Sequence, residues 1–295
     1  MDNMSVYRQP ISETGAIITW CPGCGNFGIL QAFKKAVNEL GIEPHRVAIV
    51  TGIGCHGKLA NYINVNSIHT IHGRVLPMMT AIKAVNKDLV VVGFAGDGDQ
   101  YGIGVGHLPH VVRRNPDVTL IVHNNTVYGL TTGQASPTTE RGQVTRTTPW
   151  GQWEEPINPI AMMVALRASF VARGFAGDVE HLKYIIKEAI KHKGFSFIDV
   201  LQPCVTFDKL HTYTWYRQRI YKLEETGHDP TNWEEAMKKA YEWGDRIPIG
   251  IIYKEEKPTM EELLEPIKKN PPLAYLPLQP KPIKDLMEKL VSLTK

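Results

Sequence analysis

Four short apolar segments are spaced along the chain. They lie at 46–51, 89–95, 118–122 and 195–201. Unbroken apolar runs of this length are typical of parallel strands that are covered on both faces of a sheet. The pattern therefore predicts four buried strands.

Helical patterns lie between these segments. Residues 179–193, for example, place Leu182, Ile185, Ile186 and Ile190 along one stripe, as in an amphipathic helix. Alternating strands and helices predict an α/β fold, in which a parallel sheet carries helices on both faces. The predicted helices are 27–40, 75–85, 103–112, 159–173 and 179–193.

The last third of the chain has a different character. Residues 211–243 are aromatic and charged, without a strand pattern, and from residue 257 the chain is rich in proline. A short amphipathic helix is expected at 283–293. We therefore predict one domain, 1–256, and a tail, 257–295. The tail either lies on a surface or partner chain, or simply completes the domain.

Chemically distinctive residues follow each predicted strand. They are Gly52–Cys55, Gly96–Asp99, the pair Asn124–Asn125, and Cys204. Ligands of such sheets bind beyond the carboxyl ends of the strands, so these segments are expected to meet at one edge. There the glycine backbone suits a diphosphate, and Asp97 with Asn125 suits Mg²⁺. Alternatively, Asp97 and Asn125 are only turn formers.

Composition narrows the function classes. Of 295 residues, 43% are hydrophobic and 21% charged, which excludes a disordered chain. A net charge of +3 gives no reason to expect nucleic-acid binding. The apolar runs are far shorter than the ~20 residues of a membrane helix, and no secretion signal is recognisable. We expect a cytoplasmic protein.

The chain has four cysteines, Cys21, Cys24, Cys55 and Cys204. A Cys-x-x-Cys pair with two distant cysteines indicates a metal or cluster site rather than disulfides. An iron–sulfur cluster, a tetrahedral zinc site and redox-active or inert cysteines all remain open.

Two levels of resemblance follow from these motifs. Gly96-Asp97-Gly98 followed by Asn124-Asn125 resembles the signature of the thiamine diphosphate fold. From Trp20 to about Gly250, the chain is similar to β subunits of 2-oxoacid:ferredoxin oxidoreductases. The matching stretches are Cys21–Gly25, Gly52–His56, His69–Arg74, Gly96–Asp99, Tyr128–Gln134, Ser136–Thr139 and Gly244–Gly250.

This resemblance implies specific roles. It implies that Asp97, Asn125 and the backbone of Val127 bind Mg²⁺, and that the four cysteines hold one [4Fe–4S] cluster. Thiamine diphosphate would contact four short segments that contain glycine. These cofactor-binding residues are Ile53, Gly54, Cys55, His56, His72, Gly73, Gly98, Asp99, Gly129 and Leu130.

The implied reaction is decarboxylation of a 2-oxoacid, with coenzyme A accepting the acyl group and ferredoxin the electrons. Lys58 is a candidate partner of the substrate carboxylate, or else a solvated lysine. Thr132 stands where some relatives that accept 2-oxoglutarate have a lysine. This argues against 2-oxoglutarate and leaves pyruvate open. His123 stands where relatives often have an acidic residue, and we interpret it as a packing variation.

Thiamine enzymes need a glutamate against the aminopyrimidine ring, and the domain that carries it is missing here. The resemblance therefore implies an α, or fused αγ, partner subunit. Two other functions remain open. A non-redox thiamine diphosphate decarboxylase or synthase would leave the cysteines unexplained. A zinc-stabilised binding module would leave Asp97 and Asn125 unexplained.

Overall fold

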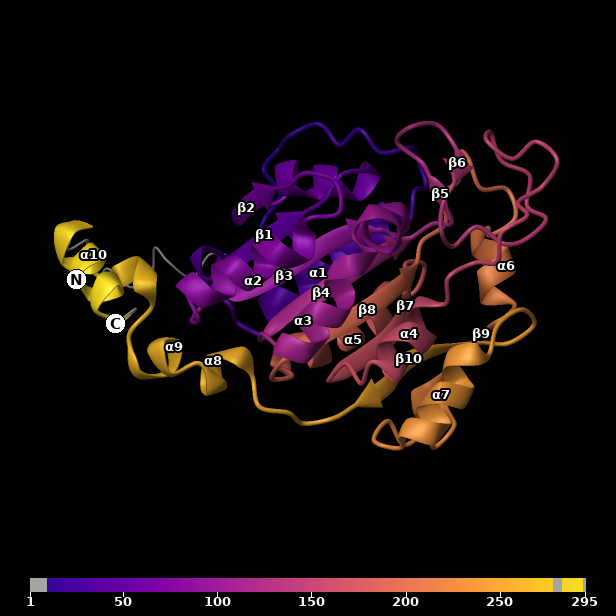
Figure 1. The fold of residues 1–295 in the computed structure, drawn as a ribbon. Coiled ribbons are helices and arrows are strands. Elements are labelled where there is room, and N and C mark those ends of the chain that lie inside the picture. Colours follow the sequence, from indigo (N-terminus) through magenta and orange to yellow (C-terminus); the bar gives the residue numbers. More distant parts are fainter. Residues whose placement is uncertain (1–9, 278–282, 294–295) are drawn as a thin grey trace, which may run out of the picture.

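The computed structural model describes residues 10–277 and 283–293. Its centre is an eight-stranded sheet in the order β2-β1-β3-β4-β8-β7-β10-β9 (Figure 1). All neighbours are parallel except β7 and β10. The four predicted strands are confirmed as β1, β3, β4 and β8. The strands are β1 (Val47–Thr51), β2 (Asn66–His69), β3 (Val90–Gly96), β4 (Val118–Asn124), β7 (Phe170–Phe175), β8 (Phe195–Leu201), β9 (Ile220–Lys222) and β10 (Ile247–Lys254), with a separate hairpin of β5 (Val127–Tyr128) and β6 (Gln134–Ala135).

Helices cover both faces of the sheet, as predicted. α1 and α5 pack on one face, and α2, α3, α4 and α7 on the other. Successive side chains of a strand point to opposite faces, so Ile121 of β4 joins the first layer, whereas Leu120 and Val122 join the second. The helices are α1 (Asn26–Glu39), α2 (Val75–Val85), α3 (Leu108–Arg114), α4 (Pro159–Ala165), α5 (Val179–Lys191), α6 (Tyr213–Arg217), α7 (Trp233–Tyr241), α8 (Met260–Leu263), α9 (Glu265–Lys269) and α10 (Ile283–Leu293).

Two of the predicted helices are wrong in extent. The helix expected at 159–173 ends at Ala165, and its second half is β7. Arg167 has a φ of 57°, which a helix cannot accommodate, and the apolar residues after it pair with β8. The helix expected at 103–112 is α3, which begins at Leu108 after a π-helical turn, Gly98–Ile103.

Three further strands of the eight-stranded sheet are not predicted by the sequence pattern. Residues 211–243, expected to lack strands, contain β9, and neither β2 nor β10 was anticipated. β2 is exposed at every residue, and β10 contains Pro248 and Gly250. Edge position and interrupting residues thus weaken the apolar pattern that identifies central strands.

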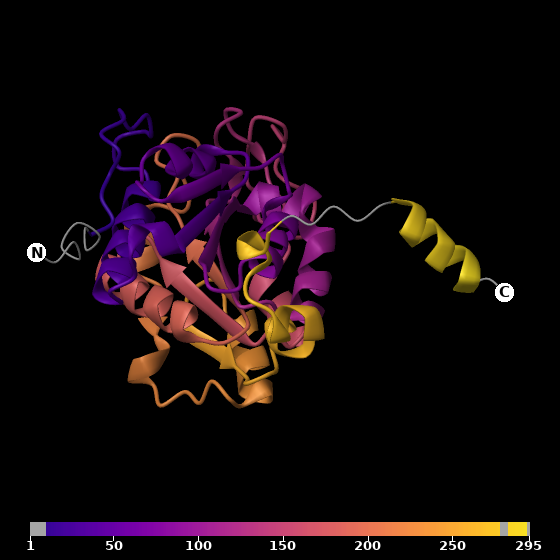
Figure 2. The ribbon, with the colours of Figure 1, turned by 90° about the vertical axis from the view of Figure 1, so that its left-hand side faces the viewer.

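The first part of the predicted tail contacts the predicted domain. Asn115 donates hydrogen bonds to the carbonyls of Lys257 and Pro258, and Met260 is buried. The Lys87 ammonium donates to the carbonyls of Ile267, Lys268 and Asn270 at the end of α9. Helix α10 is confirmed and lies away from the body (Figure 2). Within the described ranges no helix is long and apolar enough to cross a bilayer.

Asn115 provides a stability test of this assembly. Its side-chain oxygen accepts hydrogen bonds of 2.8 Å from the Phe195 amide and the Ser169 hydroxyl, and its φ is 48°. Asn115→Ala leaves a buried amide unpaired and strains the backbone, so we expect about 2–4 kcal/mol of destabilisation in urea unfolding. The exposed Asn64→Ala is the matched control and should stay near wild type. Equal midpoints for the two variants would contradict the role given to Asn115.

Candidate active site

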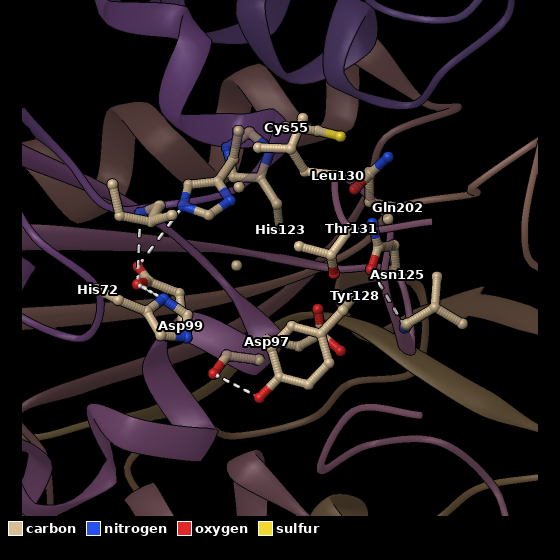
Figure 3. A pocket seen from close by; sticks show the side chains of 17 residues that line it. Cys55, His72, Asp97, Asp99, His123, Asn125, Tyr128, Leu130, Thr131 and Gln202 are labelled. Carbon is tan, nitrogen blue, oxygen red and sulfur yellow. Dashed lines mark hydrogen bonds and ion pairs between the residues drawn. The ribbon is translucent and has the colours of Figure 1, made fainter. Parts of the chain in front are cut away.

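The carboxyl ends of β1, β3 and β4 meet at a cavity of about 280 Å³ (Figure 3). This is the edge at which the sequence predicted convergence. Most of the predicted cofactor and magnesium residues line the cavity. The lining residues are Ile53, Gly54, Cys55, His56, His72, Gly96, Asp97, Gly98, Asp99, His123, Asn125, Val127, Tyr128, Gly129, Leu130, Thr131 and Gln202.

Asp97 directly follows β3 in a buried position, with 2% of its surface exposed. Burial raises the pKa of its carboxyl group to about 6, although hydrogen bonds from Ser136 and Thr138 oppose this rise. Neutral donors, namely the two hydroxyls and the backbone amides of Asp97 and Gly98, thus compensate the buried charge. A divalent cation would favour the ionised form, so this carboxylate fits a magnesium ligand.

The two asparagines at the end of β4, Asn124 within the strand and Asn125 after it, have different contacts. Asn124 points into the protein, where it donates to Asp199 and accepts a hydrogen bond from Thr138. Asn125 lines the cavity, and its side-chain oxygen accepts a hydrogen bond from the Val127 amide. The chain between β3 and β4 therefore brings Asp97, Asn125 and Val127 to one cavity wall. Their oxygen donors fit Mg²⁺.

Asp99 organises two loops rather than presenting a free carboxylate. It lies 2.8 Å from His72 Nδ1 and 3.5 Å from His56 Nε2, and accepts a hydrogen bond of 2.7 Å from the Gly73 amide. Burial would raise the pKa of Asp99, but these partners outweigh it and lower the pKa. Gly73 itself does not line the cavity; it positions Asp99.

Close packing explains why residue 98 is a glycine. A Cβ on Gly98 would stand 2.2 Å from the ring of Tyr128, whose hydroxyl donates to the Gly98 carbonyl. Only glycine lets the backbone pass under this ring. Sequence reasoning did not identify Tyr128 as a lining residue, although it lies within a motif that carried the resemblance. Thr131 and Gln202 were missed as well.

His123 is buried under the cavity. Its Nδ1 lies 2.8 Å from the side-chain oxygen of Asn26, and its ring packs near His56 and Phe94. Burial lowers the pKa of His123 well below the usual range, so the imidazole is neutral. These contacts agree with a packing role, while its place in the lining was not foreseen.

The four cysteines come together beside the cavity. The Cys55 and Cys204 sulfurs lie 3.7 and 3.8 Å from the position of a Cβ on Gly129. Burial raises the pKa of the Cys24 thiol to about 12, and the other three cysteines add to this shift. Gln202 links the cavity to the cysteines, because it lines the cavity and donates a hydrogen bond to the Cys24 sulfur. Four neighbouring thiols are a donor set that fits an iron–sulfur cluster.

Within the described part of the chain, no three His, Cys, Asp or Glu side chains are arranged to hold a single metal ion. The two predicted substrate residues lie outside the cavity lining. Lys58 donates to the Thr19 hydroxyl at 2.8 Å. Thr132 has a φ of 80° and accepts a hydrogen bond from Arg146. The structure thus places the Arg146 guanidinium beside Thr132, whose own side chain carries no charge.

Comparisons with known proteins agree with this geometry. Residues 52–200 match the family model "Thiamine pyrophosphate enzyme, C-terminal TPP binding domain". Residues 204–269 match the family model for the C-terminal part of the pyruvate ferredoxin oxidoreductase beta chain. The likeness therefore extends beyond residue 250, where the sequence motifs end, and into the predicted tail.

Individual relatives are similar over most of the chain. The 2-oxoacid:ferredoxin oxidoreductase subunit beta of Saccharolobus solfataricus is 51% identical over 80% of this chain and 82% of its own. The corresponding subunit of Sulfolobus sp. is 48% identical over 93% and 92%. A 2-oxoglutarate:ferredoxin oxidoreductase structure from Magnetococcus marinus, with 2-oxoglutarate, coenzyme A and succinyl-CoA bound, superposes with a TM-score of 0.86. It is 36% identical and covers 96% of this chain and 94% of its own.

Fold, cavity and relatives lead to one assignment: the chain belongs to the β subunits of the 2-oxoacid:ferredoxin oxidoreductases and carries their thiamine diphosphate-binding domain.

Proposed function

We propose that this protein supports coenzyme A-dependent oxidative decarboxylation of a 2-oxoacid, with electrons leaving through one [4Fe–4S] cluster to ferredoxin. One observation carries the proposal. A Cβ on Gly129 would meet the Asn125 amide nitrogen at 3.6 Å and the Cys55 and Cys204 sulfurs at 3.7 and 3.8 Å. The candidate magnesium ligand Asn125 and two of the candidate cluster ligands therefore lie close to the same glycine.

The residues of the cavity have distinct tasks in this scheme. Asp97, Asn125 and the Val127 carbonyl hold Mg²⁺ and with it the diphosphate. Asp99 fixes the loops that carry His56 and His72. When bound, thiamine diphosphate supplies the carbon nucleophile and electron sink for decarboxylation. The protein contributes position and a preorganised electrostatic environment.

The cysteines provide the electron path. Cys55 lines the cavity, whereas Cys24 is buried behind it. Four thiolates are the usual ligand set of a [4Fe–4S] cluster, and a cluster at this place would accept electrons close to where decarboxylation releases them. A non-redox decarboxylase has no use for such a set, and a binding module without catalysis disagrees with the family.

The chain is proposed to work only with an α or fused αγ subunit. Thiamine chemistry needs a glutamate at the aminopyrimidine ring, and no glutamate lines the cavity in the described residues. The substrate is a 2-oxoacid. Thr132 has no positive charge to pair with the second carboxylate of 2-oxoglutarate, and this favours pyruvate as the substrate. Arg146 would supply that charge if its hydrogen bond to Thr132 were broken.

The cluster can be tested by iron and acid-labile sulfide analysis of the chain purified without oxygen. We expect about four iron and four sulfide per chain, and their loss in Cys204→Ser, which removes one ligand. Ser196→Ala is a control that removes a buried hydroxyl within β8. Zinc without sulfide in the wild type would refute the electron path.

The magnesium site can be tested at Thr138, which donates to both Asp97 and Asn124. Thr138→Ala removes this support, so we expect a Mg²⁺ dissociation constant about 10–100-fold higher with thiamine diphosphate present. Calorimetric titration gives the value. Thr80→Ala deletes a hydroxyl bonded within α2 and should leave the affinity intact. Similar Mg²⁺ affinities for the two variants would contradict the role of Thr138 in supporting Asp97 as a metal ligand.

The partner requirement can be tested by turnover. The purified chain with pyruvate, coenzyme A, thiamine diphosphate and Mg²⁺ should reduce no ferredoxin, because the pyrimidine-side glutamate is absent. Co-purification with its α subunit should restore reduction, followed by the bleaching of ferredoxin. Robust reduction by the isolated chain would disprove the dependence.

A further inference from the structure

A buried histidine outside the cavity has carboxylates on both sides. His211 is 1% exposed, with Nδ1 2.7 Å from Asp208 and Nε2 3.1 Å from Glu140. Tyr216 stacks on its ring, and Trp215 packs edge-on. His211, Trp215 and Tyr216 belong to the aromatic and charged region to which the sequence motifs assign no function. His211, Asp208 and Glu140 form an ion triad in which His211 and Asp208 are buried and Glu140 is partly exposed.

Asp208 connects this triad to two functional segments. Its carboxylate accepts a hydrogen bond of 2.8 Å from the Thr126 hydroxyl. Its backbone amide donates to the carbonyl of Cys204 at 3.1 Å. Asp208 therefore joins the loop after β4 to the segment that carries the fourth cysteine.

Thr126 stands between two candidate magnesium ligands, Asn125 and Val127. Its φ is 58°, a conformation that is costly for a β-branched residue and persists only where the surroundings hold it. The holding contacts are Asp208 at the hydroxyl and Thr139, which donates to the Thr126 carbonyl. The backbone turn that aims both candidate ligands thus depends on Asp208.

We propose that His211 and Asp208 are positioning residues for the metal loop: the imidazolium fixes Asp208, and Asp208 fixes the left-handed turn at Thr126. The inference rests on the proposed function, because it gives Asn125 and Val127 their meaning as ligands. It assigns a task to two residues that do not line the cavity.

The charge state agrees with this role. Burial alone would lower the pKa of His211, but the hydrogen bonds with Asp208 and Glu140 outweigh it and raise the pKa to about 9. The same contacts lower the pKa of both carboxyl groups, and the pKa of Tyr216 is raised by its burial. His211 is therefore a cation at neutral pH, and its contribution is lost as the pH rises through 9.

The experiment measures Mg²⁺ affinity, with thiamine diphosphate present, in the complete complex with its partner subunit. His211→Gln and Thr126→Ala should each raise the dissociation constant about 10–100-fold. The double variant should add little to the larger single effect, since both act along one path. The ratio between His211→Gln and wild type should stay constant from pH 7 to 8 and fall towards one above pH 9, where wild type also loses the cation.

His181→Gln is the matched control. His181 is buried on α5 and pairs with Glu224 at 3.1 Å, remote from the cavity lining. The His181→Gln variant should bind Mg²⁺ with the same affinity as the wild type. Wild-type affinity in His211→Gln, or full additivity with Thr126→Ala, would overturn the inference. Should His211→Gln fail to fold, wild-type affinity in Thr126→Ala would overturn it alone. A wild type that binds no Mg²⁺ with thiamine diphosphate would instead refute the proposed function.

Discussion

The buried carboxylate of Asp97 is the constraint around which the site is built. Moving a carboxylate out of water is costly unless hydrogen bonds or an opposite charge compensate it. Here the compensation comes from the neutral hydroxyls of Ser136 and Thr138, and the pKa stays raised. The segment from Ser136 to Thr139 must therefore fold back onto the end of β3. That requirement places β5, β6 and the turn between them over the cavity.

Much of this arrangement could be predicted from the sequence. The central strands are apolar on both faces, so β3 and β4 were recognisable, and one crossover between parallel strands brings Asp97 and Asn125 to the same edge. The cysteines could be grouped as well, because Cys55 and Cys204 each follow a central strand. Regular backbone carries such information over long distances.

Irregular backbone does not carry such information along the sequence. The apolar stretch 159–173 contains no signal for the left-handed residue Arg167 that divides it into α4 and β7. Lys58 was proposed as a substrate residue from its distance to Cys55 along the chain, but its ammonium points to Thr19. Thr132 was considered alone, whereas the structure sets Arg146 beside it. The last two cases depend on contacts between loops, and spacing along the chain does not encode those contacts.

The same electrostatic rule governs the cysteines and Asp97. Burial raises the pKa of Cys24 as it raises the pKa of Asp97, so a nearby cation would favour the anionic form of each. Both sets of ligands meet at Gly129, and Asp208 joins the loop before it to the carbonyl of Cys204. Under the proposed function, the two candidate ligand sets would therefore share one stretch of loop backbone.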